Sequence, residues 1–148
     1  MQLISAICDF ATAGLSPPFR VHRDGCDIAE AQAAGMLSMQ RTLPYVEAFA
    51  AKNAQTNADS GASGKFLVGA KRSAADVLLA QALYEAAEAC KGAGTQLQWL
   101  QEACPHLHAV VQDVIAQPNV AAYLASDLRY PPSGPAYVQQ VDEVLGRK

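Results

Sequence analysis

The stretch from Ala74 to Cys90 constrains the fold more than any other part of the sequence. Residues 73–76 (SAAD) match the signature of a helix start, in which a Ser or Thr and an acidic residue three positions later cap free backbone N–H groups. After this start, Gln81, Glu85 and Glu88 share one narrow polar stripe, and apolar residues cover the rest. A helix with so little polar surface is buried on most sides, so the sequence predicts an almost fully buried central helix.

Pro and Gly divide the rest of the sequence into further stretches with helical spacing. Residues 1–13 are apolar apart from a narrow polar stripe, and they predict a first helix that is buried on most sides. A capping signature at residues 27–30 opens a second helix, in which Pro44 either introduces a kink or starts a new turn after a break. The apolar face expected for this second helix consists of Met36, Met39, Leu43, Val46 and Phe49.

Turn-forming residues set the expected boundaries of the remaining helices. Residues 53–64 (NAQTNADSGASG) are the clearest predicted loop, and Gly92 and Gly94 are expected to end the central helix. Pro105 and Pro118 each suit the first position of a helix, where the missing N–H costs nothing. The residues expected on the apolar faces of these two helices and of a last amphipathic helix are Leu107, Val110, Val111, Val114, Ile115, Val120, Tyr123, Leu124, Val138, Val141, Val144 and Leu145.

The periodicity of the chain also fixes the expected fold class. No segment alternates apolar and polar residues with the period of two that is typical of a strand. The sequence therefore predicts an all-α fold, a multi-helix bundle that forms a single domain over residues 1–148.

The composition and charge of the chain argue against several classes of function. Half of the 148 residues are hydrophobic (51%), while a net charge of −3 gives no strong field for nucleic acid or a membrane. No apolar run approaches the roughly 20 residues that span a bilayer. The N-terminal stretch has no basic residue before its apolar part and carries Asp9, so it does not fit a secretory signal. The cysteines Cys8, Cys26, Cys90 and Cys104 form no C-x-x-C pair, and because the N-terminal stretch does not fit a secretory signal, we expect reduced thiols and a cytoplasmic protein.

Three features suggest chemistry, and each also has a simpler interpretation. Residues 61–65 (GASGK) resemble the end of a phosphate-binding loop, but Asp59 and Phe66 stand where that motif needs Gly and Ser or Thr, so we expect a flexible loop. His106 and His108 are two residues apart and point to opposite sides of a helix, so we expect solvated histidines and no metal site. Asp9 lies either on an exposed helix edge or on a stripe that faces a ligand or another subunit.

Several short motifs occur in an order and spacing that match one protein family. FLVG at residues 66–69 and RSAAD at residues 72–76 form a loop and a capping box that open a central helix. Residues 1–18, 43–47 (LPYVE) and 118–126 correspond to the helices before and after it. Together these motifs resemble the C-terminal all-helical domain of the glutathione transferase family, most closely its alpha and sigma types. The resemblance covers nearly the whole chain.

The resemblance implies a function that depends on a second domain. Family members carry a thioredoxin-like domain ahead of this one, and it holds most of the glutathione site and the Tyr, Ser or Cys that stabilises the thiolate. The sequence contains no such segment, so we expect no catalytic residue, no metal and no cofactor in this chain. Glutathione would be the co-substrate of the full-length enzyme, and small hydrophobic electrophiles its substrates. The implied partner is a thioredoxin-like domain or a second subunit in a homodimer.

The resemblance also assigns roles to individual positions. Asp9 aligns with a carboxylate that reaches the glutathione amino group of the neighbouring subunit. Ser73 and Asp76 are implied to be structural caps rather than catalytic residues. The positions implied to line the electrophile pocket or its lid are Leu15, Ser16, Phe19, Val138 and Val141.

Two classes of function follow from these expectations. In the first, the chain is the electrophile-pocket domain of a detoxifying glutathione transferase, a fragment or truncated form that is inactive or nearly so alone. In the second, it is a non-enzymatic interaction module, since domains that resemble it serve as docking units in translation-related assemblies. A carrier of small hydrophobic ligands is a further alternative.

Overall fold

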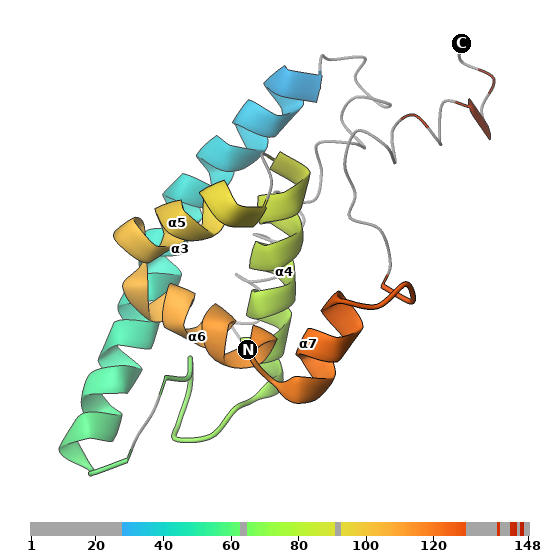
Figure 1. The fold of residues 1–148 in the computed structure, drawn as a ribbon. Coiled ribbons are helices and arrows are strands. Elements are labelled where there is room, and N and C mark those ends of the chain that lie inside the picture. Colours follow the sequence, from blue (N-terminus) through green and yellow to red (C-terminus); the bar gives the residue numbers. More distant parts are fainter. Residues whose placement is uncertain are drawn as a thin grey trace.

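The structure is a computed structural model, and it describes residues 28–62, 65–90 and 93–129 together with positions 139, 143, 144 and 146. The helices in this part of the chain are α3 (Ile28–Asp59), α4 (Ala74–Cys90), α5 (Ala93–Ala103), α6 (Pro105–Ile115) and α7 (Pro118–Leu124) (Figure 1). These described residues contain helices and no strand, which confirms the all-α prediction.

The core lies where α4, α5 and α6 pack against one another and where α3 packs against α4 and α6. In Figure 1, α3 and α7 lie on opposite sides of this central group. Leucines and valines of α3, α4 and α6 supply most of the core volume, and Leu67 enters it from the loop before α4. The largest fully buried apolar side chains are Leu43, Leu67, Leu79, Leu100, Leu107, Val110 and Val111.

The start and the buried face of α6 follow directly from its sequence. Pro105 occupies the first turn, as predicted, because its missing N–H has no partner to lose there. Leu107, Val110, Val111 and Val114 are buried, and Ile115 packs against them from the edge. This spacing of three and four residues confirms the predicted apolar face.

The central helix α4 has the predicted bounds but is less buried than predicted. Ala75, Leu79 and Leu83 recur at intervals of four residues and are buried. Val77 and Leu78 are exposed by 45% and 42%. An apolar helix is buried on all sides only where other elements cover every side. The described helices cover the side of α4 that carries Leu79 and Leu83, and the opposite side is exposed.

Helix α3 is longer than predicted and does not break at Pro44. It continues through residues 53–59, which belong to the stretch 53–64 that the sequence predicts as a loop. Met39, Leu43 and Val46 are buried as predicted, but Ala50 takes the next core position and Phe49 is 60% exposed. The prediction was therefore wrong at this point, because the core position belongs to Ala50 and not to its neighbour Phe49.

Helix α5 was not predicted, because Gly94 was expected to end the preceding helix and instead lies within α5. A glycine inside a helix costs only about 1 kcal/mol relative to alanine, so burial of Leu100 can offset it. Helix α7 starts at Pro118 as predicted, but Tyr123 is 48% exposed rather than inward. Near the C-terminus, Val144 is 84% exposed, against the apolar face predicted for the last helix.

Candidate functional site

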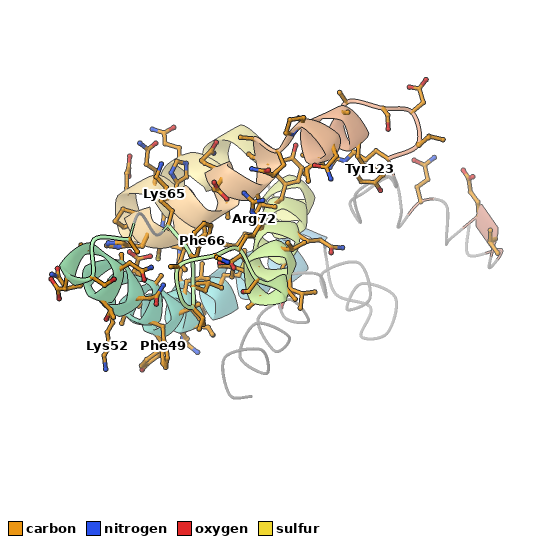
Figure 2. All side chains as sticks on the ribbon, turned by 90° about the horizontal axis from the view of Figure 1, so that it is seen from below. Phe49, Lys52, Lys65, Phe66, Arg72 and Tyr123 are labelled. Carbon is orange, nitrogen blue, oxygen red and sulfur yellow. The ribbon has the colours of Figure 1, made fainter. Side chains whose placement is uncertain are left out.

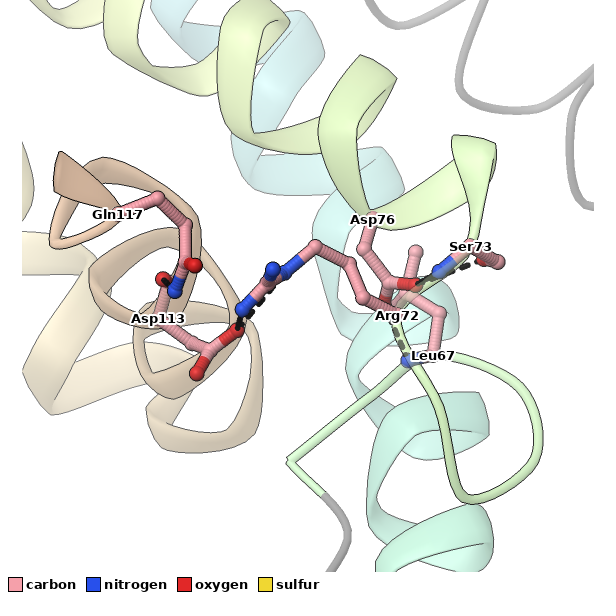
Figure 3. A network of polar contacts seen from close by, with 6 residues as sticks. All are labelled: Leu67, Arg72, Ser73, Asp76, Asp113 and Gln117. Atoms are coloured by element: carbon pink, nitrogen blue, oxygen red, sulfur yellow. Dashed lines mark hydrogen bonds and ion pairs between the residues drawn. The ribbon is translucent and has the colours of Figure 1, made fainter. Parts of the chain in front are cut away.

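The start of α4 is held by the carboxylate of Asp76, which is fully buried (Figure 3). Its Oδ1 accepts a hydrogen bond from the Leu67 N–H at 2.7 Å. Its Oδ2 accepts two more, from the Ser73 N–H at 2.6 Å and the Ser73 hydroxyl at 2.7 Å. Three donors therefore compensate the burial of this charge, which is costly without partners. The predicted caps Ser73 and Asp76 are in direct contact, and they also fix the loop before α4.

The other side of the same loop is attached to α3 by two asparagine side chains. The Asn53 amide donates to the carbonyls of Phe66 at 2.8 Å and Gly69 at 2.9 Å, and its Oδ1 accepts from the Gly69 N–H at 2.9 Å. Asn57, one turn further along, donates to the Gly69 carbonyl at 2.7 Å. Gly69 has φ of 70°, a left-handed conformation that glycine adopts without strain.

An ion pair connects this loop to α6. The Arg72 guanidinium donates to Asp113 Oδ2 from Nη2 at 2.6 Å and from Nε at 3.1 Å, as Figure 3 shows. The Gln117 side chain donates to the Asp113 carbonyl at 2.9 Å. Both charged side chains are about one-third exposed, so solvent weakens the pair, and pairs of this kind contribute about 1 kcal/mol or less.

A second carboxylate, that of Glu47 on α3, caps the start of α6. Its Oε1 accepts from the His106 N–H at 3.0 Å, and its Oε2 accepts from the Leu107 N–H at 2.9 Å. The ring Nδ1 of His106 lies 2.7 Å from the same Oε1. His106 is therefore bound to Glu47 rather than merely solvated, which corrects our expectation for this residue.

The Cys104 thiol lies beside this cap, at the N-cap position of α6, and it is fully buried. Burial raises the pKa of Cys104 to about 11, and the negative charge of Glu47 contributes in the same direction. A reactive cysteine requires the opposite environment, one that lowers the thiol pKa. Cys104 is therefore a structural residue of the core.

The polar networks in the described part of the chain are structural in character. The carboxylates of Asp76 and Glu47 accept backbone N–H groups, and the two asparagine amides bind backbone carbonyls. No group of three or more metal-ligating side chains occurs within residues 28–62, 65–90 and 93–129. Among the helices of this part, none is long and apolar enough to cross a membrane.

The sequence-predicted binding positions lie outside the residues that the structure describes. Asp9 was predicted to contact glutathione, and it belongs to residues 1–27, as do three of the pocket positions. The remaining pocket positions lie in the undescribed C-terminal stretches. The positions concerned, which stay predictions, are Asp9, Leu15, Ser16, Phe19, Val138 and Val141.

The sequence did not predict the two long-range contacts of α3, namely the asparagine contacts with the loop before α4 and the Glu47 cap of α6. The polar residues Asn53 and Asn57 indicated a loop, although their spacing of four also suits one face of a helix. A signal for Glu47 existed as well. Cys104 is a much weaker acceptor than a Ser or Asp cap and makes no side-chain cap bond, so the free N–H groups after Pro105 need an acceptor from elsewhere. The identity of that acceptor depends on packing.

Comparison with known proteins gives one positive result. The family model described as "Glutathione S-transferase, C-terminal domain" matches residues 29–127, about two-thirds of the chain. No curated protein matches the chain, and no solved structure does. The matched region contains the capped start of α4 and its connections to α3 and α6. The chain therefore belongs to the family of proteins with a glutathione S-transferase C-terminal domain.

Proposed function

We propose that this chain is the electrophile-binding domain of a glutathione transferase, and that it acts together with a thioredoxin-like domain that activates glutathione. The buried Asp76 carboxylate carries this proposal. It fixes the start of the central helix with three hydrogen bonds, at the position where the family resemblance implies a structural cap. A rigid helix of this kind can support an apolar pocket on the elements around it.

The chemistry of conjugation supports this division of labour. Glutathione reacts as a thiolate, and a positioned hydrogen-bond donor or positive charge is needed to lower its thiol pKa. The polar side chains described at the starts of α4 and α6 form hydrogen bonds within the chain, so they are not the donors that would lower the thiol pKa of glutathione. We therefore expect the isolated chain to bind hydrophobic electrophiles without turning them over. A cytoplasmic location suits the proposal, because a free thiol such as Cys104 stays reduced there.

An activity assay with a ligand titration tests the proposal. The isolated chain is mixed with glutathione and a chlorinated nitroaromatic electrophile, and it should not accelerate their reaction. The same electrophile, without glutathione, should change the fluorescence of Trp99, which packs at the edge of the core. Rapid turnover by the isolated chain would contradict the need for a second domain. An unchanged fluorescence, together with no binding in calorimetry, would contradict the pocket.

A docking module is the second candidate, and one observation favours it. Tyr45 and Phe49 on α3 are 77% and 60% exposed, although large aromatic side chains are usually at least partly buried. Aromatic residues on an exposed helix face are typical of protein interfaces. A pull-down under native conditions that recovers no partner, with the chain monomeric at micromolar concentration, would count against this second function.

A further inference from the structure

The outward face of α3 carries two aromatic residues between two basic ones. Arg41, Tyr45, Phe49 and Lys52 follow one another at intervals of four, four and three residues, so they lie on one side of the helix. All four are exposed. Figure 2 shows Phe49 and Lys52 projecting from the same side of α3. We call these four residues the α3 stripe.

The α3 stripe is positively charged although the whole chain has a net charge of −3. Between residues 31 and 58 the sequence contains a single carboxylate, Glu47, and it is turned toward α6, where it caps that helix. Arg41 and Lys52 have no ion-pair partner among the described residues. Within the described part of the chain, the stripe therefore presents two cations without an ion-pair partner, one on each side of its aromatic centre.

This charge pattern argues against a second copy of the chain as the occupant. If two α3 stripes paired in antiparallel orientation about Tyr45 and Phe49, Arg41 of one copy would face Lys52 of the other. In parallel orientation each cation would face its own equivalent. Both arrangements place like charges together next to a desolvated centre, which is unfavourable.

The pattern instead fits a partner with the opposite charges. At a rise of about 1.5 Å per residue, the two cations lie about 16 Å apart along the helix. Two cations are few for adhesion to an anionic membrane, where clusters of several basic residues are usual. We propose that the α3 stripe docks an acidic amphipathic helix of another protein. Its apolar side chains would cover Tyr45 and Phe49, and its carboxylates would pair with Arg41 and Lys52.

Peptide binding to the full chain tests this proposal, which is independent of the proposed catalytic partnership. The probe is a labelled amphipathic peptide with a leucine face and glutamates at its two ends, and a second peptide carries lysines instead. Fluorescence anisotropy at low ionic strength should show at least about tenfold tighter binding of the acidic peptide. Equal affinity for both peptides, or no binding of either, would overturn the proposal.

Two variants of the stripe sharpen the test. The double substitution Tyr45→Ala and Phe49→Ala should weaken binding of the acidic peptide by about tenfold or more. The charge reversal Arg41→Glu and Lys52→Glu should transfer the preference to the lysine peptide. Matched controls away from the stripe are Leu128→Ala, which changes another exposed apolar residue, and Lys65→Glu, which changes another exposed cation. Circular dichroism confirms that each variant is folded.

Two further measurements distinguish the proposed acidic helix from two other occupants of the α3 stripe, a second copy of the chain and a membrane surface. Sedimentation should show that Tyr45→Ala and Phe49→Ala leave the oligomeric state of the chain unchanged, and a dimer that dissociates in this variant would overturn the proposal in favour of self-association. Vesicles of phosphatidylcholine with phosphatidylserine should not bind the chain. Binding to these vesicles that is lost after Arg41→Glu and Lys52→Glu would overturn it in favour of a membrane surface.

Discussion

Asp76 carries the largest share of the polar stabilisation at the start of α4. Replacing it with alanine removes the cap and leaves the buried N–H of Leu67 without an acceptor. We expect Asp76→Ala to lower the free energy of unfolding by about 2–4 kcal/mol, combining the lost cap with an unpaired buried donor. Urea denaturation followed by circular dichroism measures this change.

The matched control for this prediction is Ser73→Ala. It removes the hydroxyl bond to Asp76 but keeps the bonds from the backbone N–H groups of Ser73 and Leu67. We expect a loss of about 1 kcal/mol, as is typical of a single cap side chain. Equal losses in the two variants would show that the carboxylate has no role beyond the hydroxyl contact.

The buried thiol of Cys104 gives a prediction about reactivity. Because its pKa is raised from 9.0 to about 11, the folded chain holds about a hundredfold less thiolate at this position near neutral pH. Alkylation of Cys104 by iodoacetamide, followed by peptide mass spectrometry, should therefore be at least about a hundredfold slower in the folded chain than in urea. Rapid labelling under native conditions would contradict the burial of this side chain.

The same pKa shift predicts how stability depends on pH. The folded state favours the neutral thiol, so this contribution is complete below about pH 9 and is lost as the pH rises toward about 11. The stability difference between the native chain and Cys104→Ala should therefore decrease across this interval. Other groups titrate there too, but they are common to both proteins and cancel in the difference.

At the scale of the element, α3 contains a residue that a helix interior usually excludes. Pro44 has no N–H, so one hydrogen bond of α3 is missing, and the residue is exposed. Pro44→Ala restores that bond and should raise the free energy of unfolding by about 1–3 kcal/mol. Gln40→Ala, on the same exposed face, should change it by less than about 0.5 kcal/mol. Destabilisation by Pro44→Ala would show that a local bend at this residue is needed for packing.

The extent of α3 also shows how far the sequence alone could predict the fold. The apolar spacing of Met39, Leu43 and Val46 was enough to identify the helix and its core face. The end of the helix was not predictable in the same way, because Asn53 is stabilised by carbonyls of a loop that follows more than ten residues later. Local composition describes which bonds a residue can make, and packing decides which ones form.

The same distinction applies to the candidate site. Ser73 and Asp76 were identified from sequence because both partners of the cap lie within four residues. The Glu47 cap of α6 was missed, because its donors are about 60 residues away. Motifs with local partners are therefore predictable from a single sequence, whereas contacts between distant helices are not.

At the scale of the whole molecule, α4 and α6 form the centre and α7 lies at its margin. Both α4 and α6 pack against α3 and α5, and α6 has four buried residues. Helix α7 packs against α6 but has no buried residue. Beyond the end of α7, the Arg129 guanidinium lies 5.1 Å from the centre of the Tyr84 ring of α4.

This difference in burial predicts that α7 opens without global unfolding. Amides of residues 107–114 in α6 should exchange with deuterium only when the whole chain unfolds, because their side chains are part of the shared core. Amides of α7 should exchange through a local opening whose free energy is at least about 2 kcal/mol lower. Asp76→Ala should then lower the protection of α6 by the same amount as it lowers global stability, while α7 keeps its own rate. If α7 were as protected as α6 and followed it in the variant, the two helices would belong to one cooperative unit, and the marginal position of α7 would have no energetic meaning.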